Sequence, residues 1–286
     1  MRDPLRQLTP KEFPPLLKEI ADPPTKLYLR GKFPDHKNKF LAVVGARRFS
    51  AYGKEVCEKL IAGLAGFPIV IVSGLALGID SIAHKAALQN RLITVAVPGS
   101  GLNDDVLYPP SHKNLAKEII EKGGALLSEF EPGFISAPFA FPQRNRIMAG
   151  LSNAVLIIEA EQKSGTMITA KLATEYNRDV LTVPGSIFSK NSEGPHLLLR
   201  LGATPIRHSS DILEALGFET KSETVKEVPE DCSREEKTLL QLLAEPLSKD
   251  DLIIRSGLSP QTVNATLSLM EIRGLIKETQ GEIHRA

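Results

Sequence analysis

The sequence predicts an α/β fold in which a doubly wound, mostly parallel sheet is followed by a small C-terminal winged-helix domain. From residue 39 to residue 217, short runs rich in Val and Ile alternate with longer amphipathic runs. Apolar runs without polar alternation are typical of strands that are buried on both faces of a parallel sheet. Near the carboxyl terminus, two amphipathic runs flank Gly257, which is typical of a helix-turn-helix.

The first 38 residues form a proline-rich lead-in segment. The pairs Pro14–Pro15 and Pro23–Pro24 interrupt this segment and leave room for one short helix at residues 16–20. Longer helices are not expected here, because proline cannot donate a backbone hydrogen bond. We expect the segment, residues 1–38, to pack on the domain that follows.

The α/β domain is expected at residues 39–218. Its predicted strands lie at the apolar runs FLAVVG, PIVIVSG, LITVAVPG, ALLSE, NAVLIIEA and DVLTVPGS. Amphipathic runs such as SAYGKEVCEKLIAGL, SHKNLAKEIIEKG and SGTMITAKLATEYN separate these strands and are predicted to be helices. Repeated strand–helix units place the strands in parallel and the helices on both faces of the sheet.

Residues 219–232 are charged and poor in large apolar side chains, so we interpret them as a linker. The winged-helix domain is expected at residues 233–286, with helices at residues 234–244, 249–255 and 260–273. The tail LIKETQGEIHRA, with a turn at Gln280–Gly281, predicts a two-stranded wing.

Composition limits the classes of function. The chain carries 35 basic and 34 acidic residues, so any nucleic-acid site must be a local patch. Its two cysteines, Cys57 and Cys232, have no metal-ligand or disulfide spacing. We therefore expect no metal, no cofactor and a cytoplasmic location. The sequence shows no secretory leader and no membrane-spanning stretch, so we expect no membrane partner.

Ligands of doubly wound sheets bind at the loops that follow the carboxyl ends of the strands. The first such loop holds Gly45, Arg47 and Arg48, just before a helix whose expected N-cap is Ser50. Backbone amides at a helix start, with a guanidinium beside them, favour a phosphate. A tight turn with two solvated arginines is the alternative interpretation.

The second loop contains Ser73, Gly74 and Gly78. It has neither the GK[ST] ending of a P-loop nor a GxGxxG pattern, which argues against ATP and NAD. Its glycines indicate that the backbone approaches another group closely. Asp80 and His84, at positions i and i+4, are candidates for acid–base chemistry, although a helix-start carboxylate beside an imidazole is the commoner explanation.

The third loop is expected ahead of a helix at IMAGLS, and it holds Phe141, Arg144, Asn145 and Arg146. Its arginines offer phosphate ligands and its aromatic ring offers a face for base stacking. Alternatively, the arginines pair with the acidic residues of the segment SEFEPG.

The fourth loop holds Lys163, Ser164 and Gly165. Ser164 is expected to cap the helix that follows, and Lys163 to meet a phosphate unless it is simply exposed. In the predicted fold, the four loops lie on one rim of the sheet. They would form a basic patch on a protein of almost neutral net charge.

Together these motifs resemble the DprA/Smf family from about Pro10 to the carboxyl terminus. The segments that carry the resemblance are, in order, DPPTKLYLRG, VVGAR, SGLALGIDSIAH, YPP, LLSEFEPG, FPQRNRIMAGLS, EAEQKSGTMITA and VPGS. Each segment is weak evidence alone, whereas their order and spacing are specific.

The resemblance implies a Rossmann-like fold and a non-enzymatic protein that binds single-stranded DNA, forms homodimers and loads the RecA recombinase during natural transformation. It implies a phosphate pocket around Arg47, with Arg48 outside it. The other residues that it implies for the site are Ser73, Gly74 and Gly78 as walls, Phe141, Arg144 and Asn145 as the rim, and Lys163 as a further basic residue.

The sequence departs from the family pattern at two places. Too few residues precede Asp22 for the sterile-alpha-motif-like domain that many members carry, and Ala46 stands where members often have Ser or Thr. In the predicted recognition helix, PQTVNATLSLMEIR, Gln261 and Asn264 are the early candidates for base contact. A protein contact or a weak DNA role is therefore at least as well supported as operator recognition.

The main alternative is an enzyme, a nucleoside-monophosphate phosphoribohydrolase with a similar Rossmann-like fold. Those enzymes carry a PGGxGTxxE loop. Here the segment KSGTMITAKLATE keeps Ser-Gly-Thr but lacks the preceding PGG, and its glutamate is displaced to Glu175. A nicotinamide dehydrogenase lacks its GxGxxG motif here, and a transcription factor is supported by the winged helix alone.

Overall fold

The computed structural model describes residues 4–219, 232–243, 246–279 and 281–285. The chain divides into two compact units, residues 1–220 and 221–286. Nearly all of the predicted linker, residues 219–232, lies outside the described residues. In the described part of the chain, no helix has the length and apolar character that are needed to cross a bilayer.

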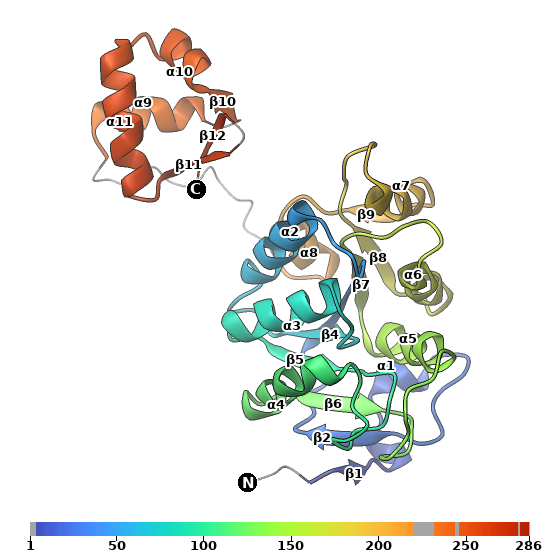
Figure 1. Cartoon of the computed structure of the whole chain (residues 1–286). Helices are drawn as coiled ribbons and strands as arrows, with labels where there is room; N and C mark the ends of the chain where they lie inside the picture. Colours follow the sequence, from blue (N-terminus) through green and yellow to red (C-terminus); the bar gives the residue numbers. More distant parts are fainter. Residues whose placement is uncertain (1–3, 220–231, 244–245, 280, 286) are drawn as a thin grey trace. The chain divides into compact units, whose positions relative to one another are not determined.

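A nine-stranded sheet forms the centre of the first unit (Figure 1). Its strand order is β1-β2-β6-β5-β4-β3-β7-β8-β9. The strands are β1 Arg6–Gln7, β2 Tyr28–Gly31, β3 Lys39–Val44, β4 Ile69–Ser73, β5 Ile93–Ala96, β6 Ala125–Ser128, β7 Ala154–Ile157, β8 Asp179–Thr182 and β9 Thr204–Pro205. The pairs β1–β2 and β2–β6 are antiparallel, and every other neighbouring pair is parallel. The predicted mostly parallel α/β sheet is confirmed.

Helices cover both faces of this sheet (Figure 1). They are α1 Pro15–Lys18, α2 Ala51–Ala62, α3 Ile79–Gln89, α4 Lys113–Glu121, α5 Ala140–Leu151, α6 Gly165–Glu175, α7 Glu193–Arg200 and α8 Ser209–Ala215. Strand β3 shows how the sequence divides the core: Leu41 and Val43 pack with α2, α3 and α8, whereas Ala42 and Val44 pack with α1, α5 and α6. Successive side chains of a strand point to opposite faces, so a strand buried on both faces is apolar throughout.

The proline-rich lead-in segment contributes β1, β2 and α1 to the first unit. Strand β2 pairs with β6, so the sheet begins before residue 39. Helix α1 places Leu17, which is fully buried, against α5, where a Cβ on Gly150 would lie 2.9 Å from both Leu17 Cδ1 and Ile20 Cγ2. The glycine therefore lets the two helices approach closely.

The second unit is a winged helix, as predicted. Its elements are α9 Arg234–Leu242, β10 Leu247–Ser248, α10 Lys249–Ser256, α11 Pro260–Ile272, β11 Ile276–Thr279 and β12 Glu282–Arg285, with the strand order β10-β12-β11. Gly257 ends α10 with φ of +67°, a left-handed conformation that glycine adopts without a Cβ penalty. Its core is a separate apolar cluster that includes Leu239, Val263 and Met270.

We predict that Leu17→Ala lowers the free energy of unfolding by about 3 kcal/mol, because it removes buried methyl groups and leaves a cavity between α1 and α5. Lys18→Ala, at an exposed position of the same helix, is the matched control and should change stability by less than about 0.5 kcal/mol. Urea unfolding followed by circular dichroism measures both. Equal, small effects would show that the lead-in segment is not part of the cooperative unit.

Candidate nucleic-acid interface

The strand order reverses at β3, which has β4 on one side and β7 on the other. In open α/β sheets, ligands bind outside the carboxyl ends of the strands at such a switch point. A pocket of about 760 Å³ lies there, lined by the loops that follow β3 and β7 and by α5. Among the predicted site residues, those that line it are Gly45, Arg47, Phe141, Arg144, Asn145, Ser164 and Gly165.

Other predicted residues have different surroundings. Ser73 is fully buried, and its hydroxyl donates to the carbonyl oxygen of Val43 at 2.6 Å. Arg146 forms an ion pair with Glu129 and does not line the pocket. Lys163 is exposed in the turn before α6. The pairing of Arg146 matches the alternative interpretation, in which arginines of this segment neutralise the acidic residues of SEFEPG.

The prediction of a loop at residues 141–146 is wrong, because α5 already begins at Ala140. Pro142 lies in the first turn of this helix, where its missing N–H costs no intrahelical hydrogen bond. On a helix, successive residues are about 100° apart, so Arg144 and Arg146 point in nearly opposite directions. This geometry explains why only one of the two arginines reaches the pocket.

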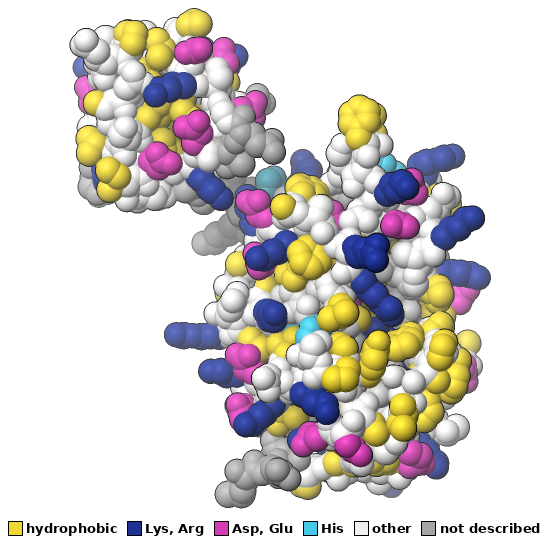
Figure 2. All heavy atoms as spheres, viewed as in Figure 1, with side chains coloured by type: hydrophobic (Ala, Val, Ile, Leu, Met, Phe, Trp, Pro, Cys, Tyr) yellow, Lys and Arg dark blue, Asp and Glu magenta, His cyan; other side chains and the backbone are white. Residues whose placement is uncertain are grey.

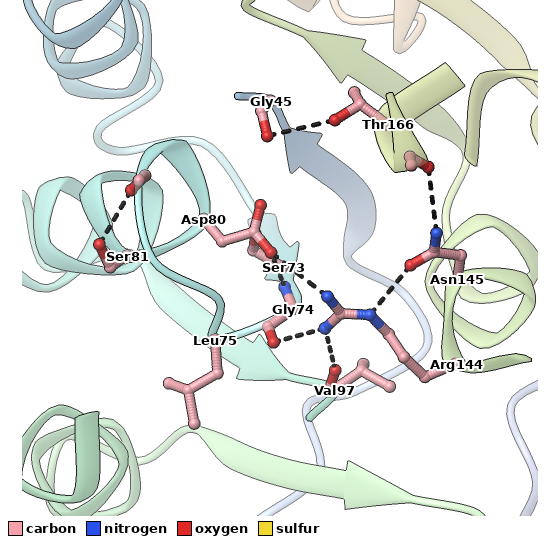
Figure 3. A network of polar contacts seen from close by, with 12 residues as sticks. Gly45, Ser73, Gly74, Leu75, Asp80, Ser81, Val97, Arg144, Asn145 and Thr166 are labelled. Atoms are coloured by element: carbon pink, nitrogen blue, oxygen red, sulfur yellow. Dashed lines mark hydrogen bonds and ion pairs between the residues drawn. The ribbon is translucent and has the colours of Figure 1, made fainter. Parts of the chain in front are cut away.

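Arg144 is buried, and its guanidinium is surrounded by protein acceptors (Figure 3). Its Nη1 donates to the carbonyl oxygens of Gly74 and, at 2.6 Å, Val97. Its Nε donates to Oδ1 of Asn145 at 2.9 Å, and its Nη2 lies 3.7 Å from Oδ2 of Asp80. The guanidinium therefore ties the ends of β4 and β5 to α5.

Asp80 and Arg144 form a buried ion pair. Burial raises the pKa of Asp80, and the positive charge of Arg144 opposes that rise. Conversely, burial lowers the pKa of Arg144, and the carboxylate of Asp80 opposes that change. Each charge thus depends on the other, since an unpaired buried charge is costly.

The glycines of the second loop make room for other parts of the protein. A Cβ on Gly74 would lie 1.8 Å from Nη1 of Arg144. Gly78 has φ of +86°, and a Cβ there would lie 2.3 Å from the carbonyl oxygen of Ala46. The backbone of Gly78 therefore packs directly against the β3–α2 loop. This is the close backbone approach that the sequence predicts for this glycine.

Asp80 and His84 form hydrogen bonds with different partners. Asp80 accepts a hydrogen bond from the backbone N–H of Gly74 at 3.1 Å. His84 is fully buried, and its Nδ1 lies 2.7 Å from Oγ1 of Thr94. Burial lowers the pKa of His84 to about 3, so the imidazole is neutral at physiological pH. The two side chains do not form the acid–base pair that their spacing suggests.

The cations exposed at the pocket belong to the first loop. Arg47 and Arg48 are both exposed and both line the pocket, so the expectation from the resemblance that Arg48 lies outside it is wrong. The Cζ of Arg47 lies 5.4 Å from the ring centroid of Phe141, and this ring lies 5.6 Å from that of Tyr108. Cationic and hydrophobic side chains lie side by side on this face (Figure 2). The arrangement offers positive charge next to aromatic surface.

The N-terminus of α2 is fixed by Ser50 and by two residues to which the sequence assigns no role, Glu159 and Asn191. Ser50 caps it as predicted, because its Oγ accepts from the N–H of Gly53 at 3.0 Å. The buried carboxylate of Glu159 accepts from the backbone N–H of Ser50 at 2.9 Å. Asn191 donates to Oε2 of Glu159 at 3.2 Å and to the carbonyl oxygen of Arg48 at 2.9 Å. The position of Glu159 just after β7 was the available signal; no local pattern marks Asn191.

Ser164 occupies the N-cap position of α6 but does not make the predicted capping hydrogen bond. Its Oγ is buried, and it has no hydrogen-bond partner among the described residues. The hydroxyl of Thr166 instead donates to the carbonyl oxygen of Gly45 at 3.2 Å, which joins α6 to the first loop. Among the residues that the structure describes, no cluster of three or more His, Cys, Asp or Glu side chains is placed to hold a metal.

The fold and the pocket define a Rossmann-like α/β protein with arginines exposed at its switch point, in a chain that also carries a winged helix. The chain belongs to the family of DNA recombination-mediator protein A, whose model matches residues 5–217. Residues 225–282 match the model of the DprA winged helix domain.

Relatives with known names or structures agree with this assignment. Protein Smf of Escherichia coli is 43% identical over 206 residues, which cover 72% of this chain and 54% of that protein, so the chain spans about half of its length. The crystal structure of DNA processing protein A from Streptococcus pneumoniae has a TM-score of 0.68 at 41% identity, over 76% of this chain and 75% of that one. A structure that describes the single-stranded DNA binding mode of DNA processing protein A from Helicobacter pylori has a TM-score of 0.65 at 32% identity, over 76% of this chain and 98% of that one.

We predict that Arg144→Met destabilises the protein by about 4 kcal/mol at pH 8, because it leaves Asp80 as an unpaired buried charge. The loss should be smaller at pH 5. Without its cation, the folded-state pKa of Asp80 rises further above the unfolded value, so stability is lost as the pH rises through that folded pKa. Urea unfolding across this pH range measures the difference from wild type, with Arg48→Met as the exposed control. A loss that is independent of pH would contradict this account.

Proposed function

We propose that this chain is a non-enzymatic cytoplasmic protein that binds single-stranded DNA without sequence preference through its first unit. The observation that carries the proposal is the exposed guanidinium of Arg47, which lies over the ring of Phe141 at an open pocket. Proteins that bind single strands combine a cationic groove for phosphates with aromatic rings on which bases stack. Arginine is suited to both contacts.

The residues of the site divide into two roles under this proposal. Contacts with the strand are assigned to Arg47 and Phe141, to the backbone at Gly45, Ser164 and Gly165, and to Lys163 in the exposed turn. Positioning is assigned to the buried set, Ser73, Gly74, Gly78, Arg144 and Asn145. Arg146 is left out, because Glu129 already neutralises it. The absence of sequence preference follows because phosphates and ring stacking carry no base code.

The relationship to the Helicobacter pylori protein supports this function, since that protein is described as binding single-stranded DNA. The contacts of Asp80 support a role without catalysis. This carboxylate lines the pocket, but it is already paired with Arg144 and hydrogen-bonded to the backbone N–H of Gly74.

The winged helix is not assigned to strand binding. The exposed residues of α11 include Gln261, Asn264, Leu269 and Ile272, and the last two are 58% and 83% exposed. Helices that read the major groove normally expose Arg, Lys, Asn or Gln along that face. The exposed apolar side chains of Leu269 and Ile272 suit contact with a protein better than contact with phosphates.

We also propose that the protein acts as a homodimer that passes the bound strand to the RecA recombinase. The family of recombination mediators supports this role. Ile187 and Phe188, in the connection from β8 to α7, are 80% and 92% exposed, and such apolar exposure supports a contact between copies. Sedimentation velocity should show a dimer that Phe188→Asp weakens. A wild-type monomer at micromolar concentration would exclude this part of the proposal.

The proposed function is tested by fluorescence anisotropy of the full chain with a single strand and with a duplex of the same length at two salt concentrations. Binding should favour the single strand and weaken as salt rises, because each neutralised phosphate releases counterions. Nucleotide hydrolysis is assayed on the same sample, and turnover there would favour the enzyme alternative. Equal affinity for both DNAs would refute single-strand recognition.

In that assay, we predict that Arg47→Ala costs about 2 kcal/mol of binding free energy and lowers the salt slope by about 0.7. Arg48→Ala is the matched control at an adjacent exposed cation, and it should cost under about 1 kcal/mol. The difference is expected because Phe141 holds the Arg47 guanidinium in place before DNA arrives. Similar losses in both variants would indicate a diffuse basic face in place of a defined contact.

A further inference from the structure

An apolar surface lies beside the pocket, in the connection from β6 to α5. Ile135 is 74% exposed and Phe139 is 59% exposed. Single exposed apolar side chains are ordinary on proteins. Here they adjoin the binding site, because the intervening Pro138 and the following Phe141 line the pocket. Figure 2 shows hydrophobic side chains gathered over this connection and the start of α5, next to the cationic side chains.

The ring of Phe139 packs against a pair of stacked aromatic rings. Phe130, which is 9% exposed, stacks on Phe134 with ring centroids 4.5 Å apart. Phe134 meets Phe139 edge to face at 6.0 Å. Phe139 is also the N-cap residue of α5, so its backbone is fixed by the helix start. A planar group that is positioned in advance loses little conformational entropy when a ligand packs on it.

The carboxylates of the same connection are engaged by cations. Glu129 pairs with Arg146, and Glu131 pairs with Lys26 at 2.7 Å. The hydroxyl of Tyr28 also donates to Glu131, at 2.5 Å. This neutralisation lowers the electrostatic cost of bringing a polyanion close to the apolar side chains.

We infer that Ile135, Pro138 and Phe139 form a shelf on which bases of a bound single strand stack, while its phosphates face Arg47. The inference rests on the proposed function and names the surface that distinguishes a single strand from a duplex. Bases of a duplex are stacked inside the helix and cannot reach a shelf, whereas those of a single strand are free to do so. The occupant is nucleic acid, because the shelf is continuous with the cationic pocket.

The test compares Phe139→Ala with wild type, as full chains, on oligothymidylate and on an abasic strand of equal length. Affinity for oligothymidylate should fall about tenfold, which matches the loss of one base–aromatic stack. Affinity for the abasic strand should change less than about twofold, because that strand has no base to stack. The salt slope should stay unchanged, since no phosphate contact is removed.

Ile93→Ala is the matched control. Ile93 is an exposed apolar residue at the amino-terminal end of β5, whereas the pocket lies at the carboxyl ends of the parallel strands. Its removal should leave both affinities unchanged. Phe139→Trp, which keeps a stacking surface, should retain binding to oligothymidylate. Urea unfolding should give similar midpoints for the Phe139→Ala variant and wild type.

Any of three results would overturn the shelf while leaving the proposed function intact. One is an unchanged affinity of Phe139→Ala for oligothymidylate, and another is an equal loss on both strands, which would mean that Phe139 only supports the pocket. A change in sedimentation of the DNA-free variant would assign the surface to a protein contact and would also overturn it. Failure of the wild type to bind oligothymidylate would refute the proposed function itself.

Discussion

The pocket depends on one buried guanidinium. Arg144 does not face solvent. Its N–H groups point to the carbonyl oxygens that follow β4 and β5, to Asp80 and to Asn145. The β4–α3 loop that it fixes carries Gly78, on which the β3–α2 loop rests. Asn145 in turn donates to the carbonyl oxygen of Gly165 at 3.3 Å, at the start of α6. Three loops from different parts of the chain are thus set by contacts that begin at a single side chain.

This arrangement separates two populations of charge. In the inner layer, Arg144 is balanced by Asp80, and Arg146 by Glu129. In the outer layer, Arg47 and Arg48 are exposed at the pocket. A formal net charge of +1 therefore hides a local excess, because the inner pairs cancel and the outer cations are concentrated at one edge of the sheet. Global charge is a poor guide to the partners of a protein built in this way.

The sequence predicts the architecture well because strands that are buried on both faces appear in it as short apolar runs. The strands of the parallel sheet are predominantly apolar, and the three helices of the second unit end within two residues of their predicted ends. The apolar run IMAGLS predicts the start of α5 too late, because the helix already begins at Ala140 and includes Pro142 in its first turn. Local patterns also show which side chains are cationic but not which are already paired. The pairing of Arg146 with Glu129 agrees with the alternative that the sequence offers, whereas the pairing of Arg144 with Asp80 becomes visible only when the chain is folded.

The two edge strands of the large sheet affect how copies of the protein would contact one another if they bound the same DNA strand, as proposed. Each edge strand, β1 and β9, has only two residues, and Pro205 removes one backbone donor from β9. Long exposed edges invite pairing with another sheet, and short edges that contain proline prevent it. If the chain binds DNA as proposed, copies gathered on one polymer would reach high local concentrations, and these short edges would disfavour the pairing of sheets between copies. Under the proposed function, contacts between copies would be left to helices and loops.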